Sequence, residues 1–235
     1  MKRLYTPSLP EIFRIDTSSL DSTETHLELL FLKSGGKFNY LSATKSLLYA
    51  FKGLHNLDQL VAGCETSGSK IGRQFNVEVA KLASPVAFGR KTQVFDFPRR
   101  QFRFGADRAA PFRVPFFFVE DEIIKILFLQ PAKSGGLAEH QLGGLFTVLK
   151  KHLLDREFYG EQTDIEYIDT SSPTIGGARQ LTRKSLIDVK LWTEDMVAEH
   201  LTMIAKALSN LEARGLAEDI KPRRPFKDPE LPLFD

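Results

Sequence analysis

A lysine and two glycines close the most apolar segment of the chain, residues 112–136. The apolar pattern predicts two strands joined at the acidic cluster Glu120–Glu122. The second strand is followed by Gln130, Lys133 and the two glycines. A glycine turn that opens a helix can present backbone N–H groups to an anion, with a lysine beside it. The longer phosphate-loop pattern, in which the lysine follows the glycines, does not occur. The turn is therefore interpreted either as a phosphate site or as a plain strand-to-helix turn.

Arginine and phenylalanine alternate in the segment before it, residues 88–113. Seven basic residues stand against two aspartates there, which gives a local charge of +5. Arginines can contact the phosphates of a nucleic acid, and exposed aromatic rings can stack on unpaired bases. In a half-buried strand, however, Phe102 and Phe104 would face a core while Arg103 faces water. Because arginines on that outer face stay available to phosphates, we predict DNA contacts at four of them: Arg99, Arg100, Arg103 and Arg113.

The composition is typical of a globular protein without a membrane segment. The chain has 235 residues, of which 42% are hydrophobic and 26% charged, and it is long enough to bury a large core. Its apolar runs fall short of the ~18 residues that a membrane-spanning helix requires. The single cysteine, Cys64, excludes an internal disulfide framework, and the N-terminus lacks the apolar run of a signal peptide. We therefore expect a cytoplasmic protein with no membrane partner.

Hydrophobic periodicity divides the chain into helices and strands. Apolar residues recur at spacings of three and four in the predicted helices, which cover residues 42–54, 71–82 and 137–154. Alternation marks the predicted strands, which cover residues 92–97, 101–104, 113–119, 123–129 and 164–168. We expect an α/β or α+β fold with a mixed central sheet flanked by helices. Its expected parts are an N-terminal helical and loop region (1–69), a core domain (70–215) and a flexible tail (216–235).

A long helix closes the predicted core domain. Thr193 is placed to cap its start and Gly215 to end it. Its apolar residues alternate at spacings of four and three, as in a short coiled-coil seam: Val197, Leu201, Ile204, Leu208 and Leu211. This pattern fits a helix packed on its own domain, and it also fits the seam of a homodimer.

The order helix, three strands, helix, strand over roughly residues 70–170 resembles the core of the PD-(D/E)XK nuclease superfamily, the restriction-endonuclease-like proteins. In that family carboxylates hold Mg²⁺ while a lysine orients or activates water near the scissile phosphate. The resemblance implies that Glu78, on the helix before the sheet, and Asp107 are catalytic residues and hold the Mg²⁺ ion. It implies further catalytic roles for Gln130 and Lys133 at the end of a strand.

The chain departs from the family's motif at two places. Arg113, Val114 and Pro115 stand where the family has an aspartate that opens a strand. Gln130 and Lys133 are three residues apart where the family has two, so on a regular strand their side chains would point to opposite faces. Two interpretations therefore stay open beside catalysis. The chain is a catalytically degenerate relative that still binds DNA, or Gln130 and Lys133 simply solvate a strand end.

Residues 230–234, Glu-Leu-Pro-Leu-Phe, resemble the short peptide by which bacterial replication and repair proteins dock on the sliding clamp. The resemblance implies that Leu231, Leu233 and Phe234 enter an apolar pocket of the clamp, after a flexible basic spacer. Glu230 replaces the glutamine of that pattern. Packing of the same residues onto the chain's own core is the alternative.

Together these features predict a bacterial DNA-associated protein with a nuclease-like fold. It would either cleave phosphodiester bonds with Mg²⁺ or bind DNA as a degenerate relative that needs no cofactor. The competing hypothesis is a non-enzymatic assembly protein that uses its C-terminal helix and tail.

Overall fold

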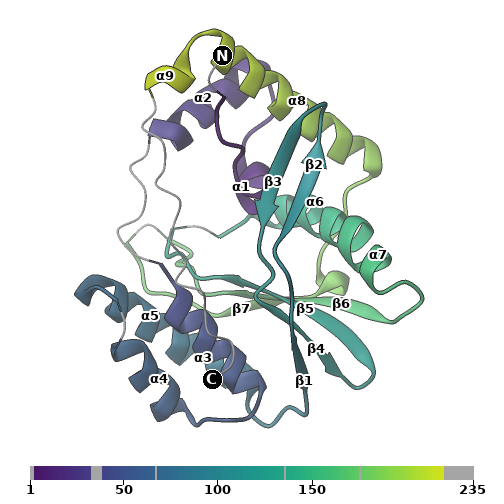
Figure 1. The fold of residues 1–235 in the computed structure, drawn as a ribbon. Coiled ribbons are helices and arrows are strands. Elements are labelled where there is room, and N and C mark those ends of the chain that lie inside the picture. Colours follow the sequence, from purple (N-terminus) through teal and green to yellow (C-terminus); the bar gives the residue numbers. More distant parts are fainter. Residues whose placement is uncertain (1–2, 33–38, 67, 135, 175, 220–235) are drawn as a thin grey trace.

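A mixed five-stranded sheet forms the centre of the structure (Figure 1). This computed structural model describes residues 3–32, 39–66, 68–134, 136–174 and 176–219. In sheet order, the strands are β1 (Gln93–Asp96), β4 (Phe116–Glu120), β5 (Ile123–Gln130), β6 (Thr163–Asp169) and β7 (Thr182–Lys184). β5 and β6 run parallel, and every other neighbouring pair is antiparallel. The predicted α/β fold with a mixed sheet flanked by helices is confirmed.

β4 and β5 form the hairpin predicted from the apolar segment. Glu120 pairs with Ile123, which leaves Asp121 and Glu122 as a two-residue turn. Both turn residues have positive φ angles, 50° and 64°. Two residues in the left-handed region give the turn whose twist matches that of the strands, and aspartate is among the residues that tolerate this conformation. The acidic cluster therefore closes the hairpin.

Helices cover both faces of the sheet (Figure 1). On the first face lie α1 (Leu9–Arg14), α2 (Leu20–Leu32), α6 (Glu139–Leu149), α8 (Glu194–Ala213) and a small hairpin of β2 (Arg100–Phe104) and β3 (Arg108–Phe112). On the second face lie α3 (Leu41–Phe51), α4 (Leu57–Glu65), α5 (Lys70–Ala83) and the 3-10 turn η1 (Ser84–Ala87). β5 supplies both cores, because Ile126 and Phe128 point to the first face and Leu127 and Leu129 to the second.

The predicted ends of the long helix α8 are confirmed. The hydroxyl of Thr193 accepts a hydrogen bond from the backbone N–H of Met196 at 3.2 Å and so caps α8. Gly215 follows the helix with φ of +85°, a conformation that glycine adopts without strain. α6 runs on into a π-helical turn, η2, and the short α7, so the predicted helix over residues 137–154 widens in its last part. Their bounds are Lys150–Leu154 and Asp155–Glu157.

The apolar stripe of α8 lies inside the chain's own core. Its residues are at most 6% exposed, and they pack with side chains of α2 and α6. A second chain could not reach them without unfolding this one. Of the two alternatives, packing on the helix's own domain is confirmed for Val197, Leu201, Ile204, Leu208 and Leu211, and this stripe does not form a homodimer seam.

The packing of the helices does not follow the predicted domain boundaries. Residues before position 69 contribute to both cores, α1 and α2 to the first and α3 and α4 to the second, so no gap in packing separates them from the rest. Residues 216–219, expected to begin a flexible tail, form the short helix α9 (Leu216–Asp219), and Ala217 is buried.

The proposed clamp-binding residues lie outside the described residues. None of the helices in the described part combines the length and the hydropathy needed to cross a bilayer.

Candidate functional site

The carboxyl ends of β5 and β6 lie side by side, because parallel strands end at the same edge of a sheet. Gln130 pairs with Asp169, and the amide of Thr170 donates to the carbonyl oxygen of Gln130 at 3.0 Å. In open α/β sheets the crevice outside such strand ends is the usual place for ligands. Two hollows lie there, and we call them the arginine groove and the tyrosine pocket.

The arginine groove is a cavity of about 780 Å³ between α1, the β2–β3 hairpin and the end of β5. Its charged lining, among the described residues, consists of four arginines and one glutamate, a net charge of +3. Three of the four arginines predicted to contact DNA line it, whereas Arg103 does not. We define the groove by Arg14, Arg99, Arg100, Arg113, Pro115 and Gln130.

Arg100 is held at the wall of the groove by neighbours on two sides. Its Nη2 lies 2.9 Å from Oε1 of Glu157, and its guanidinium lies 5.5 Å from the centre of the Phe97 ring. Its Nε is buried and has no hydrogen-bond acceptor within the described residues. The contacts with Glu157 and Phe97 hold the side chain in place. Because the side chain is 35% exposed, it is still open to a ligand in the groove.

The tyrosine pocket is a neighbouring cavity of about 810 Å³ between β6, β7 and the start of α6. Arg14 lines both hollows, so they adjoin. We define the pocket by Arg14, Lys133, Tyr167, Asp169, Ser171 and Lys184.

Tyr167 and Asp169 form the floor of the tyrosine pocket. The ring of Tyr167 is stacked on Phe128 and meets Phe146 edge-on, with centroid distances of 6.1 and 6.0 Å. Burial, and secondly the negative charge of Asp169, raise the pKa of Tyr167 well above its usual value. The hydroxyl is therefore neutral at every physiological pH. Oδ1 of Asp169 accepts a hydrogen bond from the amide of Ser171 at 2.6 Å.

Gln130 and Lys133 enter different hollows. Gln130 lines the arginine groove, and its Nε2 donates to the carbonyl oxygen of Ala132 at 3.4 Å. Lys133 lines the tyrosine pocket, and its carbonyl oxygen accepts a hydrogen bond from the amide of Ser172 at 2.8 Å. The strand ends at Gln130 and Lys133 lies in the turn that follows, so the two side chains line different hollows. They do not form the joint strand-end motif that the nuclease resemblance implies.

Glu78 lies near the strand ends, where an arginine engages it. Nε of Arg179 lies 3.0 Å from Oε2 of Glu78, while its Nη1 donates to the carbonyl oxygens of Pro131 at 2.7 Å and Thr170 at 2.9 Å. The Arg179 side chain is 4% exposed. The carboxylate of Glu78 therefore neutralises a buried arginine that ties α5 to the ends of β5 and β6.

Asp107 lies in the turn of the β2–β3 hairpin, on the other face of the sheet from α5 (Figure 1). It pairs with Arg3 at 2.6 Å, and the turn packs on α8. The structure thus does not bring Asp107 and Glu78 together. No group of three or more histidine, cysteine, aspartate or glutamate side chains that could hold a metal occurs among the described residues. The predicted Mg²⁺ pair has no shared site in this structure.

Three residues that line the hollows, Arg14, Tyr167 and Lys184, were not predicted from the sequence, and neither was Arg179, which binds the carbonyl oxygens at the same strand ends. Arg14 ends a six-residue helix, and Arg179 lies in a loop, so neither stands in a pattern that marks a site. Lys184 belongs to a three-residue edge strand. Tyr167 alternates with Asp169 along β6, and this alternation of polar groups on a buried strand was a usable signal.

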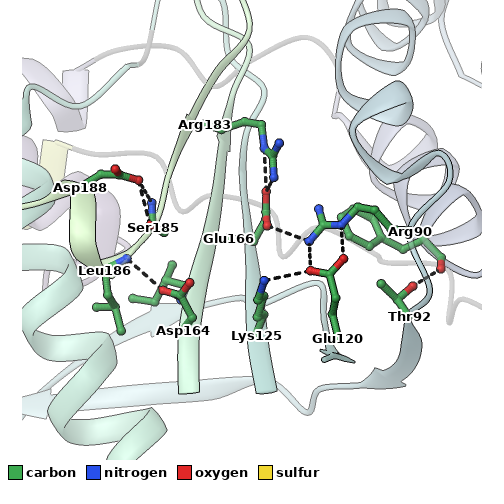
Figure 2. Close-up of polar contacts among 12 residues, drawn as sticks. Arg90, Thr92, Glu120, Lys125, Asp164, Glu166, Arg183, Ser185, Leu186 and Asp188 are labelled. Carbon is green, nitrogen blue, oxygen red and sulfur yellow. Dashed lines mark hydrogen bonds and ion pairs between the residues drawn. The ribbon is translucent and has the colours of Figure 1, made fainter. Parts of the chain in front are cut away.

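A second polar cluster lies at the opposite end of β5, on the second face of the sheet. Figure 2 shows Arg90 between Glu120 and Glu166, with Nη2 at 2.6 Å from the first carboxylate and 3.1 Å from the second. Lys125 contacts Glu120 at 2.9 Å, and Arg183 contacts Glu166 at 2.7 Å. Every charge in this cluster has an opposite partner, so we assign it to stability.

Acid is expected to weaken the fold through Glu120. Hydrogen bonds from Arg90, and then from Lys125, lower the pKa of Glu120 from 4.5 to about 2. A carboxylate whose pKa is lowered in the folded state contributes stability that is fully present above its unfolded-state pKa and is lost as the pH falls toward the folded-state value. We expect a loss of about 2–3 kcal/mol from this group between pH 4.5 and pH 2, measured by urea unfolding over that range.

Glu120→Gln is the control for this acid dependence, because it removes the titrating group and should flatten the pH profile. An NMR titration in which the Glu120 carboxyl of the folded protein titrates near 4.5 would show the expectation to be wrong.

Comparison of the chain with protein-family models, with curated proteins and with solved structures finds no match. The geometry of the two hollows is therefore the basis for the function.

Proposed function

We propose that this chain binds DNA along the carboxyl ends of β5 and β6, with phosphates in the arginine groove. The observation that carries the proposal is the convergence of arginines from three separate segments on one cavity. The whole chain has a net charge of +2, whereas the lining of this groove has +3. Positive charge concentrated in a concave surface attracts a polyanion and raises its rate of association.

Arginine suits this role because its planar guanidinium can donate two parallel hydrogen bonds to one phosphate. The Arg100 side chain is 35% exposed where it lines the groove, so its guanidinium can reach a phosphate there. Gln130 at the same wall can donate or accept and so tolerates either a phosphate or a sugar oxygen.

Binding without cleavage is the interpretation that the geometry favours. Glu78 is committed to Arg179, and Asp107 pairs with Arg3 at a distant turn. Pro115 lines the groove where the nuclease family has an aspartate. A site for Mg²⁺ would need carboxylates at the groove, and its one acid, Glu11, accepts hydrogen bonds from both the amide and the hydroxyl of Ser8.

The alternative of an assembly protein has less support. Its main docking element was the apolar stripe of α8, which is buried in the chain's own core. The sliding-clamp peptide stays a prediction, because residues 230–234 lie outside the described part of the chain.

The triple variant Arg99→Ala, Arg100→Ala, Arg113→Ala is expected to bind DNA about 100-fold more weakly at low salt, because three charge-assisted interactions are removed. The slope of log affinity against log salt should fall by about 0.9 for each phosphate that the variant no longer neutralises. Fluorescence anisotropy with a labelled duplex of about 20 base pairs, over a series of salt concentrations, measures both quantities.

Arg103→Ala is the matched control, since Arg103 is exposed on the same hairpin and does not line the groove. We expect a change in affinity smaller than about threefold. Equal losses for the control and the triple variant would refute the groove as the binding site. Plasmid cleavage with Mg²⁺ or Mn²⁺ that Lys133→Ala abolishes would overturn binding without catalysis.

A further inference from the structure

Four phenylalanine rings gather at one edge of the sheet, on its first face, and binding of phosphates in the arginine groove does not use them. β1, the outermost strand at that edge, carries Phe95, which lies directly opposite Phe117 of β4 (Figure 1). Phe97 follows β1, and Phe158 follows α7. The ring centres of neighbouring members lie between 5.0 and 6.4 Å apart. We call these four residues the aromatic cluster.

Phe95 is the most exposed member of the aromatic cluster. Its ring is stacked on that of Phe117, with the centres 5.0 Å and the planes 16° apart, and the residue is 43% exposed. Phe117 therefore covers one face of the ring. No strand among the described residues pairs with β1 on its other side, so the ring is open toward the edge of the sheet. A flat apolar surface of this kind is one on which a nucleobase stacks.

Arg100 joins the aromatic cluster to the arginine groove. Its guanidinium lies 5.5 Å from the centre of the Phe97 ring, and the same side chain lines the groove. Phe95 precedes Arg99, another residue of the groove, by four positions, so their Cα atoms are at most about 14 Å apart. At the ~3.4 Å per nucleotide of a duplex strand, about four nucleotides cover this distance, and an extended single strand needs fewer.

The combination of a positive groove and an open aromatic ring suits an unpaired strand. In a duplex the bases stack on one another, and a protein meets the phosphates, the sugars and the edges of the bases. An unpaired base has a free face, and proteins that bind single strands combine a positively charged groove with aromatic side chains on which successive bases stack. The groove can therefore hold the phosphates of any DNA, whereas Phe95 can distinguish unpaired from paired DNA.

We propose that the aromatic cluster stacks an unpaired base of a DNA strand whose phosphates lie in the arginine groove, so that the chain prefers DNA with a single-stranded segment. This inference rests on the proposed function. In it, Phe95 stacks on the base, Phe117 supports the ring from the other side, and Arg100 contacts the strand between the ring and the groove.

The test compares two labelled duplexes with a single-stranded overhang of about five nucleotides, which carries thymines in one and abasic sites in the other. The phosphates are the same, so only the bases differ. We expect the wild-type chain to bind the thymine overhang about tenfold more tightly. Phe95→Leu removes the ring and keeps an apolar side chain, so it should bind both overhangs with the affinity of the wild type for the abasic one. That unchanged affinity separates loss of stacking from loss of fold. Phe95→Trp keeps a flat ring and should retain the preference.

Phe88→Leu is the matched control, because Phe88 is also 43% exposed and belongs neither to the aromatic cluster nor to the lining of the groove. It should keep the tenfold preference. Equal binding of both overhangs by the wild type, still weakened about 100-fold in the triple arginine variant, would overturn this inference and leave the proposed function intact. Loss of the preference in Phe88→Leu as well as in Phe95→Leu would also overturn it. Absence of binding to either DNA at low salt would refute the proposed function itself.

Discussion

Arg90→Ala is expected to lower the free energy of unfolding by about 3–5 kcal/mol, because it leaves buried carboxylates without their main partner. Arg90 donates from Nε and Nη2 to Glu120, at 2.7 and 2.6 Å, and Nη2 also reaches Glu166. The side chains of Glu120 and Glu166 are 14% and 9% exposed. Equilibrium unfolding in urea measures the loss.

The same substitution also removes packing. The guanidinium carbon of Arg90 lies 5.0 Å from the centre of the Phe51 ring and 5.2 Å from that of Phe118, so the arginine covers two aromatic side chains of the second core. Arg90→Met tests how much of the effect is charge, since methionine restores apolar contact and leaves the carboxylates unpaired. We expect it to recover less than half of the loss.

Arg183→Ala is the matched control in the same cluster. Arg183 also pairs with Glu166, at 2.7 Å, but its side chain is 50% exposed, so solvent replaces it when it is removed. We expect a cost below about 1 kcal/mol. If Arg90→Ala cost no more than this control, the charges of the cluster would not be buried in solution.

Local patterns predicted the parts of the fold that local physics determines. The β4–β5 hairpin follows from two apolar runs around a turn of acidic residues, and the start of α8 follows from the hydroxyl of Thr193. The stripe of α8 was correctly identified as apolar, but periodicity alone could not say which surface covers it. In the structure α2 and α6 cover the stripe, and both helices lie far from α8 in the sequence.

The candidate site was predicted less well because it is assembled from distant segments. Arg99, Arg100 and Arg113 were found from their density along the chain, and the structure brings them to one groove. Arg14 joins them from the N-terminus, which no spacing rule indicates. The same density of positive charge also led to the prediction of a DNA contact at Arg103, because a sequence pattern does not show which residues line a cavity.

The family motif failed for a related reason. Its residues were placed by their order along the chain, and the β2–β3 hairpin carries Asp107 to the other face of the sheet. Glu78 does lie near the carboxyl ends of the strands, but the loop after β6 returns Arg179 to that place. A buried arginine supplied by a loop cannot be read from helix or strand periodicity.

Arg179→Ala is expected to destabilise the fold by about 3–5 kcal/mol and to loosen the carboxyl ends of β5 and β6. Its loss leaves the carbonyl oxygens of Pro131 and Thr170 without their donor, and each such buried group costs about 1–3 kcal/mol. It also removes a hydrogen bond at 3.1 Å to the hydroxyl of Tyr40. Urea unfolding and hydrogen exchange measure the two effects.

Hydrogen exchange locates the loosening, because the amide of Thr170 donates to the carbonyl of Gln130 at the edge where both hollows open. We expect this amide to exchange faster in Arg179→Ala under conditions where β4 stays protected. Glu78→Gln is the matched control: the Glu78 side chain is 37% exposed, and the two carbonyls keep their donor, so stability should change by less than about 1 kcal/mol. A larger loss for Glu78→Gln than for Arg179→Ala would mean that the carboxylate, and not the arginine, organises the strand ends. In that case the assignment of Arg179 as the residue that organises the strand ends would fail.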